Sequence, residues 1–189
     1  FHNQQGGCGG RQQFNRAKGQ DHTLEISISL NEVLTGTEKT IALGRGLDAE
    51  KVTVKIPAGI DAGKKLRVSG KGSPSADGGE PGDLYLLINL LDHNDFTRDG
   101  NDLIFEKQVP FSSATLGATV MVPTLEGTEL KVRIPPGIQS QAKLRLSGHG
   151  LPTGPMGPRG DIYVKILVEV PRKMSPEQKE LIRQLADTG

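Results

Sequence analysis

Two aspartates, Asp83 and Asp161, occupy equivalent places in two similar stretches of the sequence. A pair of carboxylates could serve general acid–base catalysis, in which one group takes a proton and the other gives one. Each aspartate, however, follows a glycine at the start of an expected strand, where aspartates commonly accept hydrogen bonds from nearby backbone amides. The sequence names no partner that would tune either pKa. We therefore interpret both residues as structural.

The four histidines and the single cysteine form no pattern typical of a metal site or a nucleophile. The histidines lack an H-x-x-x-H spacing, and Cys8 has no second cysteine for a C-x-x-C pair or an intrachain disulfide. Cys8 lies among glycines, and we interpret it as an exposed thiol suited to a reducing compartment. No G-x-S-x-G nucleophile motif is present. The sequence thus predicts no metal, no cofactor and no enzyme active site.

Two groups of residues could bind phosphate. Gly59, Gly63 and Lys64 are similar to a phosphate-binding loop, but the spacing is wrong by one residue and strands rather than a helix are expected to follow. The second group is basic and consists of Lys64, Lys65, Arg67 and Lys71. It lacks interleaved aromatic residues, and the 23 Lys+Arg of the chain are balanced by 22 Asp+Glu. We interpret this group as a solvated strand face and keep DNA binding as an alternative.

The clearest pattern in the chain is an internal repeat with a spacing of 78 residues. Three blocks recur at this distance: 56–60 and 134–138, 65–72 and 143–150, and 82–85 and 160–163. A constant spacing over three blocks indicates two copies of one structural unit. The 25 Gly and 12 Pro, together with only 4% aromatic residues, favour β structure with cores of Val, Ile and Leu.

We therefore expect a mostly β fold made of two tandem, β-sandwich-like units with short helices and a C-terminal helix. The expected parts are a flexible glycine-rich tail at 1–20, a first unit at 21–91, a linker at 92–100, a second unit at 101–172 and the helical region at 173–189. No apolar run approaches the roughly 20 residues that a membrane-spanning helix needs.

The expected last strand of the first unit, 84–91, is apolar on both faces apart from Asn89. Its counterpart, 162–170, carries Lys165 and Glu169. A strand that is apolar on both faces must be buried twice or must present one face to a partner. The first unit is therefore the expected place for a ligand.

The chain ends with a pattern typical of an amphipathic helix. Ser175 is the expected N-cap, Pro176 is the first helical residue, and Gln178 completes a capping box. The apolar residues of this helix share one face and are Leu181, Ile182 and Leu185. This face either packs on the second unit or forms part of a dimer contact.

These patterns combine with a joining motif, His93-x-x-Phe96-x-Arg98-x-Gly100-x-Asp102-Leu103. The repeated blocks and this motif resemble the C-terminal substrate-binding region of the DnaJ-family J-domain co-chaperones, and the start resembles the end of that family's Gly/Phe linker. The J domain's His-Pro-Asp tripeptide is absent from this sequence. Some members insert four C-x-x-C-x-G-x-G repeats between two strands, where this chain has only residues 44–51. The chain therefore resembles the zinc-free class, which includes the bacterial curved-DNA-binding homologues.

The resemblance implies a co-chaperone that binds unfolded client polypeptides for delivery to the DnaK chaperone. An extended client segment would add a strand to a sheet edge of the first unit. The implied groove residues are Ile41, Leu43, Val52, Val54, Ile56 and Leu86. His22 falls where the family can have an apolar groove residue.

The resemblance also implies further partners. The acidic C-terminal tail of DnaK would be a second ligand, and the cations nearby are Lys51, Lys55, Lys64 and Lys65. A homodimer of the full-length protein and a cytoplasmic location are implied as well. A DNA-binding module of a nucleoid-associated DnaJ homologue is the alternative function.

Overall fold

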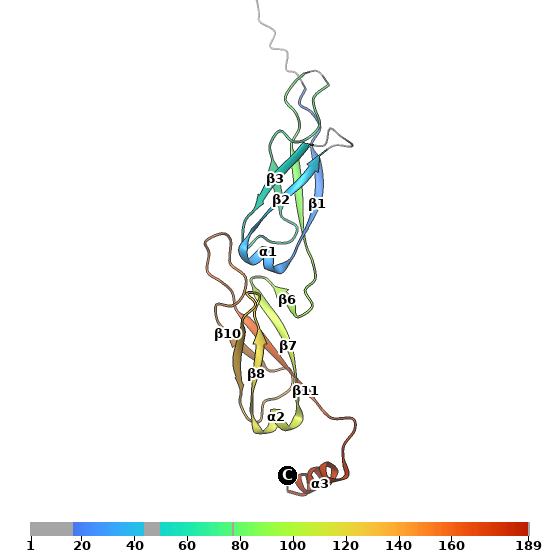
Figure 1. The fold of residues 1–189 in the computed structure, drawn as a ribbon, viewed down its shortest axis with the longest axis vertical. Helices are drawn as coiled ribbons and strands as arrows, with labels where there is room; N and C mark the ends of the chain where they lie inside the picture. Colours follow the sequence, from blue (N-terminus) through green and yellow to red (C-terminus); the bar gives the residue numbers. More distant parts are fainter. Residues whose placement is uncertain (1–16, 44–49, 77, 189) are drawn as a thin grey trace, which may run out of the picture. The chain divides into compact units, whose positions relative to one another are not determined.

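The computed structural model describes residues 17–43, 50–76 and 78–188. The described chain is mostly β, with short helices and a C-terminal helix, as the sequence predicts (Figure 1). Its first elements are β1 (His22–Ile28), α1 (Leu30–Thr35), β2 (Thr37–Leu43), β3 (Glu50–Ile56), β4 (Lys65–Val68) and β5 (Leu84–Leu90). The elements that follow are β6 (Phe96–Asp99), β7 (Asp102–Pro110), α2 (Phe111–Leu116), β8 (Ala118–Pro123), β9 (Glu129–Ile134), β10 (Lys143–Leu146), β11 (Ile162–Glu169) and α3 (Pro176–Thr188).

The chain divides into two compact units. The described parts of Phe1–Ser27 and Ala62–Asn89 form the first unit, and those of Ile28–Asp61 and Leu90–Gly189 form the second. This division differs from the boundaries expected from the repeat, because the segment containing α1, β2 and β3 groups with the second unit. The predicted Cys8 thiol and most of the predicted flexible tail lie outside the described residues.

The strand order β4-β5-β1 of the first repeat recurs as β10-β11-β7 in the second. One three-stranded sheet has the order β1-β5-β4, and one four-stranded sheet has the order β10-β11-β7-β6. In each repeat a separate two-stranded sheet follows the short helix, formed by β2 with β3 and by β8 with β9. The additional strand, β6, lies in the segment that the sequence analysis treated as a linker.

The hydrogen bonds of the turns show that the repeat is structural. The Gly63 amide donates to the Ile88 carbonyl at 2.8 Å, and the Gln141 amide donates to the Ile166 carbonyl at 2.7 Å. The first bond joins the turn before β4 to β5, and the second joins the turn before β10 to β11. The constant sequence spacing therefore reflects a constant set of turn geometries.

The cores are built from aliphatic side chains on the long strands. On β5, Leu84, Leu86 and Ile88 are all 0% exposed. On β11, Ile162 and Val164 are likewise 0% exposed. These residues lie at every second position, so each long strand has one face that is buried over most of its length.

The helix ends follow local sequence signals. Ser29 caps α1 through a capping box with Glu32, a signal that the sequence analysis did not use. The predicted capping box of α3 is confirmed, because Gln178 donates its amide to the Ser175 hydroxyl at 3.2 Å and accepts the Ser175 amide at 2.9 Å. The sequence analysis did not predict α2, whose N-cap, Pro110, makes no side-chain capping bond.

Glycines of the repeated blocks occupy places where backbones approach closely. A Cβ atom on Gly72 would lie 2.6 Å from the Gln20 carbonyl oxygen, and one on Gly150 would lie 2.7 Å from the Asn101 carbonyl oxygen. Neither distance leaves room for a side chain. The Gly-x-Gly pattern of both repeats therefore allows the loop to pack against the chain just before β1 in the first repeat and just before β7 in the second.

Candidate functional site

The β2–β3 hairpin carries five of the six residues that the resemblance assigned to a client groove. Directly opposite residues of an antiparallel pair share a face, and here Ile41 lies opposite Val52 and Leu43 lies opposite Glu50. Because faces alternate along each strand, one face of the hairpin collects the expected residues. They are Ile41, Leu43, Val52, Val54 and Ile56.

These five side chains differ in how far they are exposed. On β3, Ile56 is 1% exposed, and Val52 and Val54 are each 8% exposed, so they contribute mainly to the core. On β2, Ile41 and Leu43 are half-buried. The accessible apolar surface of this face therefore lies along β2.

The outer edge of β2 is available for pairing. Among the described residues, β2 pairs with β3 alone, so each strand of this sheet has one edge without a partner strand. The N–H and C=O groups along such an edge can form hydrogen bonds with another extended chain. The strand β2 thus combines an open edge with two partly exposed apolar side chains, which is what strand addition requires.

Leu86 has a different environment. It lies on β5, the central strand of the β1-β5-β4 sheet, and is 0% exposed. Leu86 belongs to the first compact unit, whereas the hairpin belongs to the second, so its place in a groove stays a prediction. At the edge of the same sheet, Leu24 on β1 is 37% exposed. The sequence analysis did not assign Leu24 to the site, although Leu24, Ile26 and Ile28 alternate with polar residues along β1.

The four cations expected near the site are all exposed. Lys51 and Lys55 lie on the face of the hairpin opposite to Ile41, because they are paired with Ala42 and Glu38. The other two are Lys64 and Lys65, in the first compact unit.

A further lysine, Lys39, lies on the apolar face of the hairpin. Its ammonium group contacts the Glu32 carboxylate at 3.1 Å. The Ser29 amide, which donates to this carboxylate, and then Lys39 lower the pKa of Glu32. The positive charge of Lys39 on this face is therefore paired with a carboxylate of helix α1.

The two repeated aspartates have the structural role that their sequence context predicted. The Asp83 carboxylate accepts the Gly70 amide at 2.9 Å, and Arg67 contacts it at 2.7 Å. Asp83 is 2% exposed, so it is not open to a substrate. Hydrogen bonding by Lys18 and then by the Gly70 amide lowers the pKa of Asp83 to about 2. A carboxyl group with so low a pKa is a poor general base near neutral pH.

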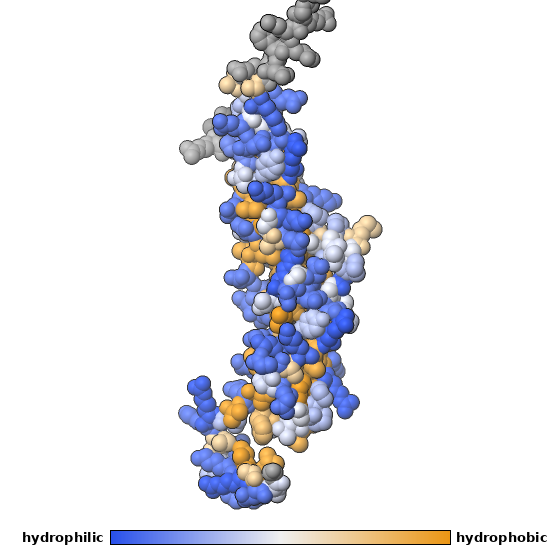
Figure 2. Space-filling view, turned by 180° about the vertical axis from the view of Figure 1, so that it is seen from behind, coloured by the Kyte–Doolittle hydropathy of each residue, from blue (hydrophilic) through white to orange (hydrophobic). Residues whose placement is uncertain are grey.

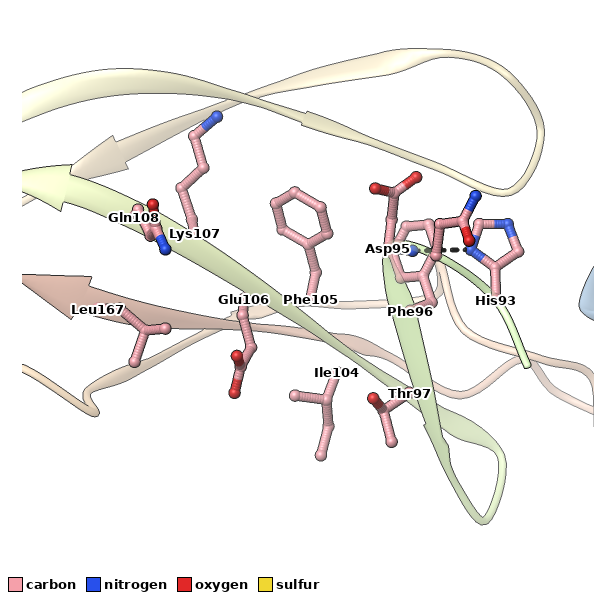
Figure 3. Close-up of a pocket in the computed structure, with 11 residues that line it drawn as sticks. His93, Asp95, Phe96, Thr97, Ile104, Phe105, Glu106, Lys107, Gln108 and Leu167 are labelled. Carbon is pink, nitrogen blue, oxygen red and sulfur yellow. Dashed lines mark hydrogen bonds between the residues drawn. The ribbon is translucent and has the colours of Figure 1, made fainter.

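A second candidate surface is a hollow of about 470 Å³ beside β6 and β7 (Figure 3). The residues that line it are His93, Asn94, Asp95, Phe96, Thr97, Ile104, Phe105, Glu106, Lys107, Gln108 and Leu167. The ring centroids of Phe96 and Phe105 are 5.6 Å apart, and those of Phe96 and His93 are 5.3 Å apart. His93 and Phe96 of the joining motif, together with Phe105 of β7, therefore form the aromatic part of the wall of this hollow.

The hollow lies at an incompletely paired strand edge. Among the described residues, β6 pairs with β7 only from Asp102 to Phe105, although β7 continues to Pro110. Figure 3 shows Phe105 and Lys107 on one side of β7 and Glu106 on the other, so the hollow reaches both sides of the strand. This edge is a second place where an extended chain could pair.

The C-terminal helix α3 presents its apolar face to solvent. Leu181, Ile182 and Leu185 are 65%, 41% and 52% exposed. In Figure 2 the helix at the bottom of the view is mostly blue and carries a small orange, hydrophobic area. The structure therefore does not show the predicted face packed on its own chain, and its role in a dimer stays a prediction.

Two further searches concern the described residues alone. They contain no group of three or more His, Cys, Asp or Glu side chains that could hold a metal ion. Within the same residues, no helix has the length and apolar character needed to cross a membrane.

Comparisons with known proteins identify the family of the chain. Residues 22–171 match the model of the DnaJ C terminal domain. The chain belongs to this family. It is 47% identical over 145 residues to the chaperone protein DnaJ of Methanothermobacter thermautotrophicus, which covers 76% of this chain and 38% of that protein. It is 39% identical over 185 residues to the chaperone protein DnaJ of Leptospira biflexa, which covers 95% of this chain and 49% of that protein.

The DnaJ C-terminal domain accounts for the repeat, the sheets and the joining motif, all of which lie within the matched residues. The chain spans less than half the length of these curated relatives. The matched region includes both candidate surfaces, the β2–β3 hairpin and the hollow beside β7.

Proposed function

We propose that this chain is the client-binding part of a DnaJ-type co-chaperone and presents extended, hydrophobic segments of unfolded proteins to a DnaK-type chaperone. The observation that carries the proposal is the open edge of β2 beside the half-buried Ile41 and Leu43. Main-chain hydrogen bonds to an edge are indifferent to client sequence, while apolar side chains select hydrophobic segments. This combination suits a protein that must bind many unfolded chains.

The expected affinity of one such site is modest. Burying two apolar client side chains gives roughly 3 to 6 kcal/mol before the cost of ordering the peptide. A single site should then bind in about the micromolar range or more weakly. Tighter binding requires that several sites of the protein bind the same client chain. The hollow beside β7 could supply a second site within the chain, and dimerisation through α3 would double the number.

The remaining parts of the proposal rest on the family. The short connection between β2 and β3 and the presence of a single cysteine support membership of the zinc-free class. The exposed Lys51 and Lys55 could contact the acidic C-terminal tail of DnaK. We place the full-length protein in the cytoplasm, where the DnaK partner acts. DNA binding through exposed lysines is the alternative function.

Titrations with labelled ligands test the proposal. A hydrophobic heptapeptide and a short DNA duplex are each titrated with the chain at low and moderate salt, and binding is measured by fluorescence anisotropy. Leu43→Asp should abolish peptide binding because it places a charge on the apolar face. Ala42→Asp is the matched control, since it places the same charge on the opposite face of the same strand. Salt-sensitive DNA binding with no peptide signal would contradict the proposal and favour the alternative, DNA binding through the exposed lysines.

A further inference from the structure

Residues Ala17–Asp21, which we call the strap, dock on the first compact unit just before β1. The Gly19 amide donates to the Glu80 carbonyl at 2.9 Å, and the Ser73 amide donates to the Gln20 carbonyl at 2.8 Å. The Ser75 hydroxyl donates to the Ala17 carbonyl at 2.6 Å. The sequence analysis assigned Ala17–Gln20 to a flexible tail, but these residues are held by the loop between β4 and β5.

The fit of the strap in this loop is close. A Cβ atom on Gly19 would lie 2.8 Å from the Gly82 nitrogen, and one on Gly72 would lie 2.6 Å from the Gln20 carbonyl oxygen. Both distances are shorter than a side chain can accept. The strap therefore occupies a slot that two glycines keep open.

An ion pair adds a charged contact to this slot. The Lys18 ammonium donates to the Asp83 carboxylate at 2.7 Å, and Arg67 reaches the same carboxylate oxygen. The Asp83 side chain is 3% exposed, whereas that of Lys18 is 45% exposed. Asp83 also donates its own amide to the Asp21 carboxylate at 2.7 Å. Two residues of the strap, Lys18 and Asp21, thus both bind the buried Asp83.

The second repeat shows which part of this arrangement the fold itself requires. There the Asp161 amide donates to Asp102 at 2.7 Å, and the Leu151 amide donates to the Asn101 carbonyl at 2.8 Å. These bonds match those of Asp21 and Gln20. Three residues before Asp102, however, the chain carries Asp99, where the first repeat carries Lys18.

Asp161 is held without a lysine. Its carboxylate is bound by Arg145 at 2.6 Å and by the Gly148 amide at 2.8 Å, the counterparts of Arg67 and Gly70. The second repeat therefore builds the same loop with an acid at the position of Lys18. It follows that the Lys18–Asp83 pair is an addition to the repeat rather than a condition for forming it.

We propose that Lys18 is an anchor that fixes the point at which the preceding chain joins the first unit. Charge-assisted hydrogen bonds to a shielded carboxylate hold a chain more firmly than backbone contacts alone. Because β1 begins at His22, the anchor holds the incoming chain at one end of this edge strand, next to the partly exposed Leu24. The ion pair therefore fixes the strap beside β1, independently of which ligand the protein binds.

Hydrogen–deuterium exchange of the whole chain tests the anchor. In Lys18→Gln, the amides of Gly19 and Ser73 should exchange about tenfold faster, as expected when one charge-assisted hydrogen bond is lost. The equivalent amide of Leu151 should keep its rate. Lys18→Arg should restore protection, and Lys64→Gln, which removes an exposed lysine elsewhere, should have no effect.

Two results would overturn the proposal. Unchanged exchange at Gly19 and Ser73 in Lys18→Gln would show that the backbone bonds alone hold the strap. Equal acceleration throughout β4 and β5 would show that Lys18 stabilises the sheet rather than anchoring the chain.

Discussion

The Asp83 carboxylate accepts the amide of Gly70 at 2.9 Å, across a loop that begins at one residue and ends at the other. The same bond joins Asp161 to Gly148 at 2.8 Å in the second repeat. Each aspartate thereby closes the loop between the two last strands of its sheet. The paired acids of the sequence are parts of two separate loops, and each loop uses its acid to satisfy backbone donors.

The first prediction concerns the pH dependence of stability. The pKa of Asp83 is lowered from 3.8 to about 2, first by the Lys18 hydrogen bond and then by the Gly70 amide, while burial opposes the shift. Between these two values the unfolded chain binds a proton that the folded chain does not. The stabilisation is therefore complete above about pH 4 and is lost as the pH falls towards 2.

Urea unfolding between pH 2 and 7 measures this effect. Asp83→Asn should lower the free energy of unfolding at pH 7 and flatten its decline below pH 4. Asp92→Asn, at an exposed position, is the control and should leave the curve unchanged. A curve for Asp83→Asn that falls as steeply as that of the unmodified chain would contradict the assignment.

The second prediction concerns the close approach of Gly150. A Cβ atom there would lie 2.5 Å from the Gly160 carbonyl carbon and 2.6 Å from the Asp161 nitrogen. Gly150→Ala should therefore destabilise the chain by about 2 kcal/mol or more, since backbone rather than a flexible side chain must move. Gly127→Ala separates steric crowding from backbone strain, because Gly127 has a φ of 80° and open space around it. Thermal unfolding should show the larger loss for Gly150→Ala.

The third prediction concerns Arg98 of the joining motif. Its guanidinium donates to the Ile60 carbonyl at 3.0 Å and to the Asp61 carboxylate at 2.8 Å, and its Nε donates to the Gly100 carbonyl. Arg98→Ala should cost roughly 2 kcal/mol of stability, because two carbonyls lose their donor. Arg98→Lys should not rescue it, since one ammonium group cannot reach acceptors in three directions.

A matched variant distinguishes the carbonyl contacts from the ion pair. Asp61→Asn keeps an acceptor for Arg98, and the Asp61 side chain is 58% exposed, so its loss of charge should cost less than about 1 kcal/mol. Chemical unfolding of the two variants measures the difference. Equal losses in Asp61→Asn and Arg98→Ala would assign the effect to charge instead.

The fold followed from the sequence where local rules decide it. The repeated glycines mark turns and close approaches, and the capping box at Ser175 marks the start of α3, so both could be predicted from short segments. Leu86 is a residue whose burial could not be predicted from a short segment. Because 84–91 is apolar on both faces, its pattern could not tell which residues are buried, and the structure shows Leu86 to be 0% exposed.

The contacts that the sequence analysis missed depend on tertiary structure. Lys18 and Asp83 are 65 residues apart, and nothing local to Lys18 indicates a partner. The strand β6 was missed because its four residues are too short to show an alternation, and its pairing with β7 supplies the stability that its own sequence lacks. The open edge beside it is visible only once the register is known.

The last prediction concerns self-association through α3. Leu185 is 52% exposed on the same face as Leu181, and in water an exposed apolar face of this kind favours burial against another surface. If the face forms a dimer contact, the chain should sediment above its monomer mass of 20.2 kDa at high concentration. Leu185→Asp should then weaken self-association on the order of tenfold or more, the effect of exposing one leucine and burying a charge.

Sedimentation equilibrium over a range of concentrations measures this association constant. Gln184→Asp adds the same charge at the neighbouring position on a different face of the helix, so it should leave association almost unchanged. Equal weakening by both variants would point to net charge rather than to the apolar face. A chain that stays monomeric at every concentration would show that α3 alone does not form the contact, because the three exposed side chains are then too small an area to hold two copies together.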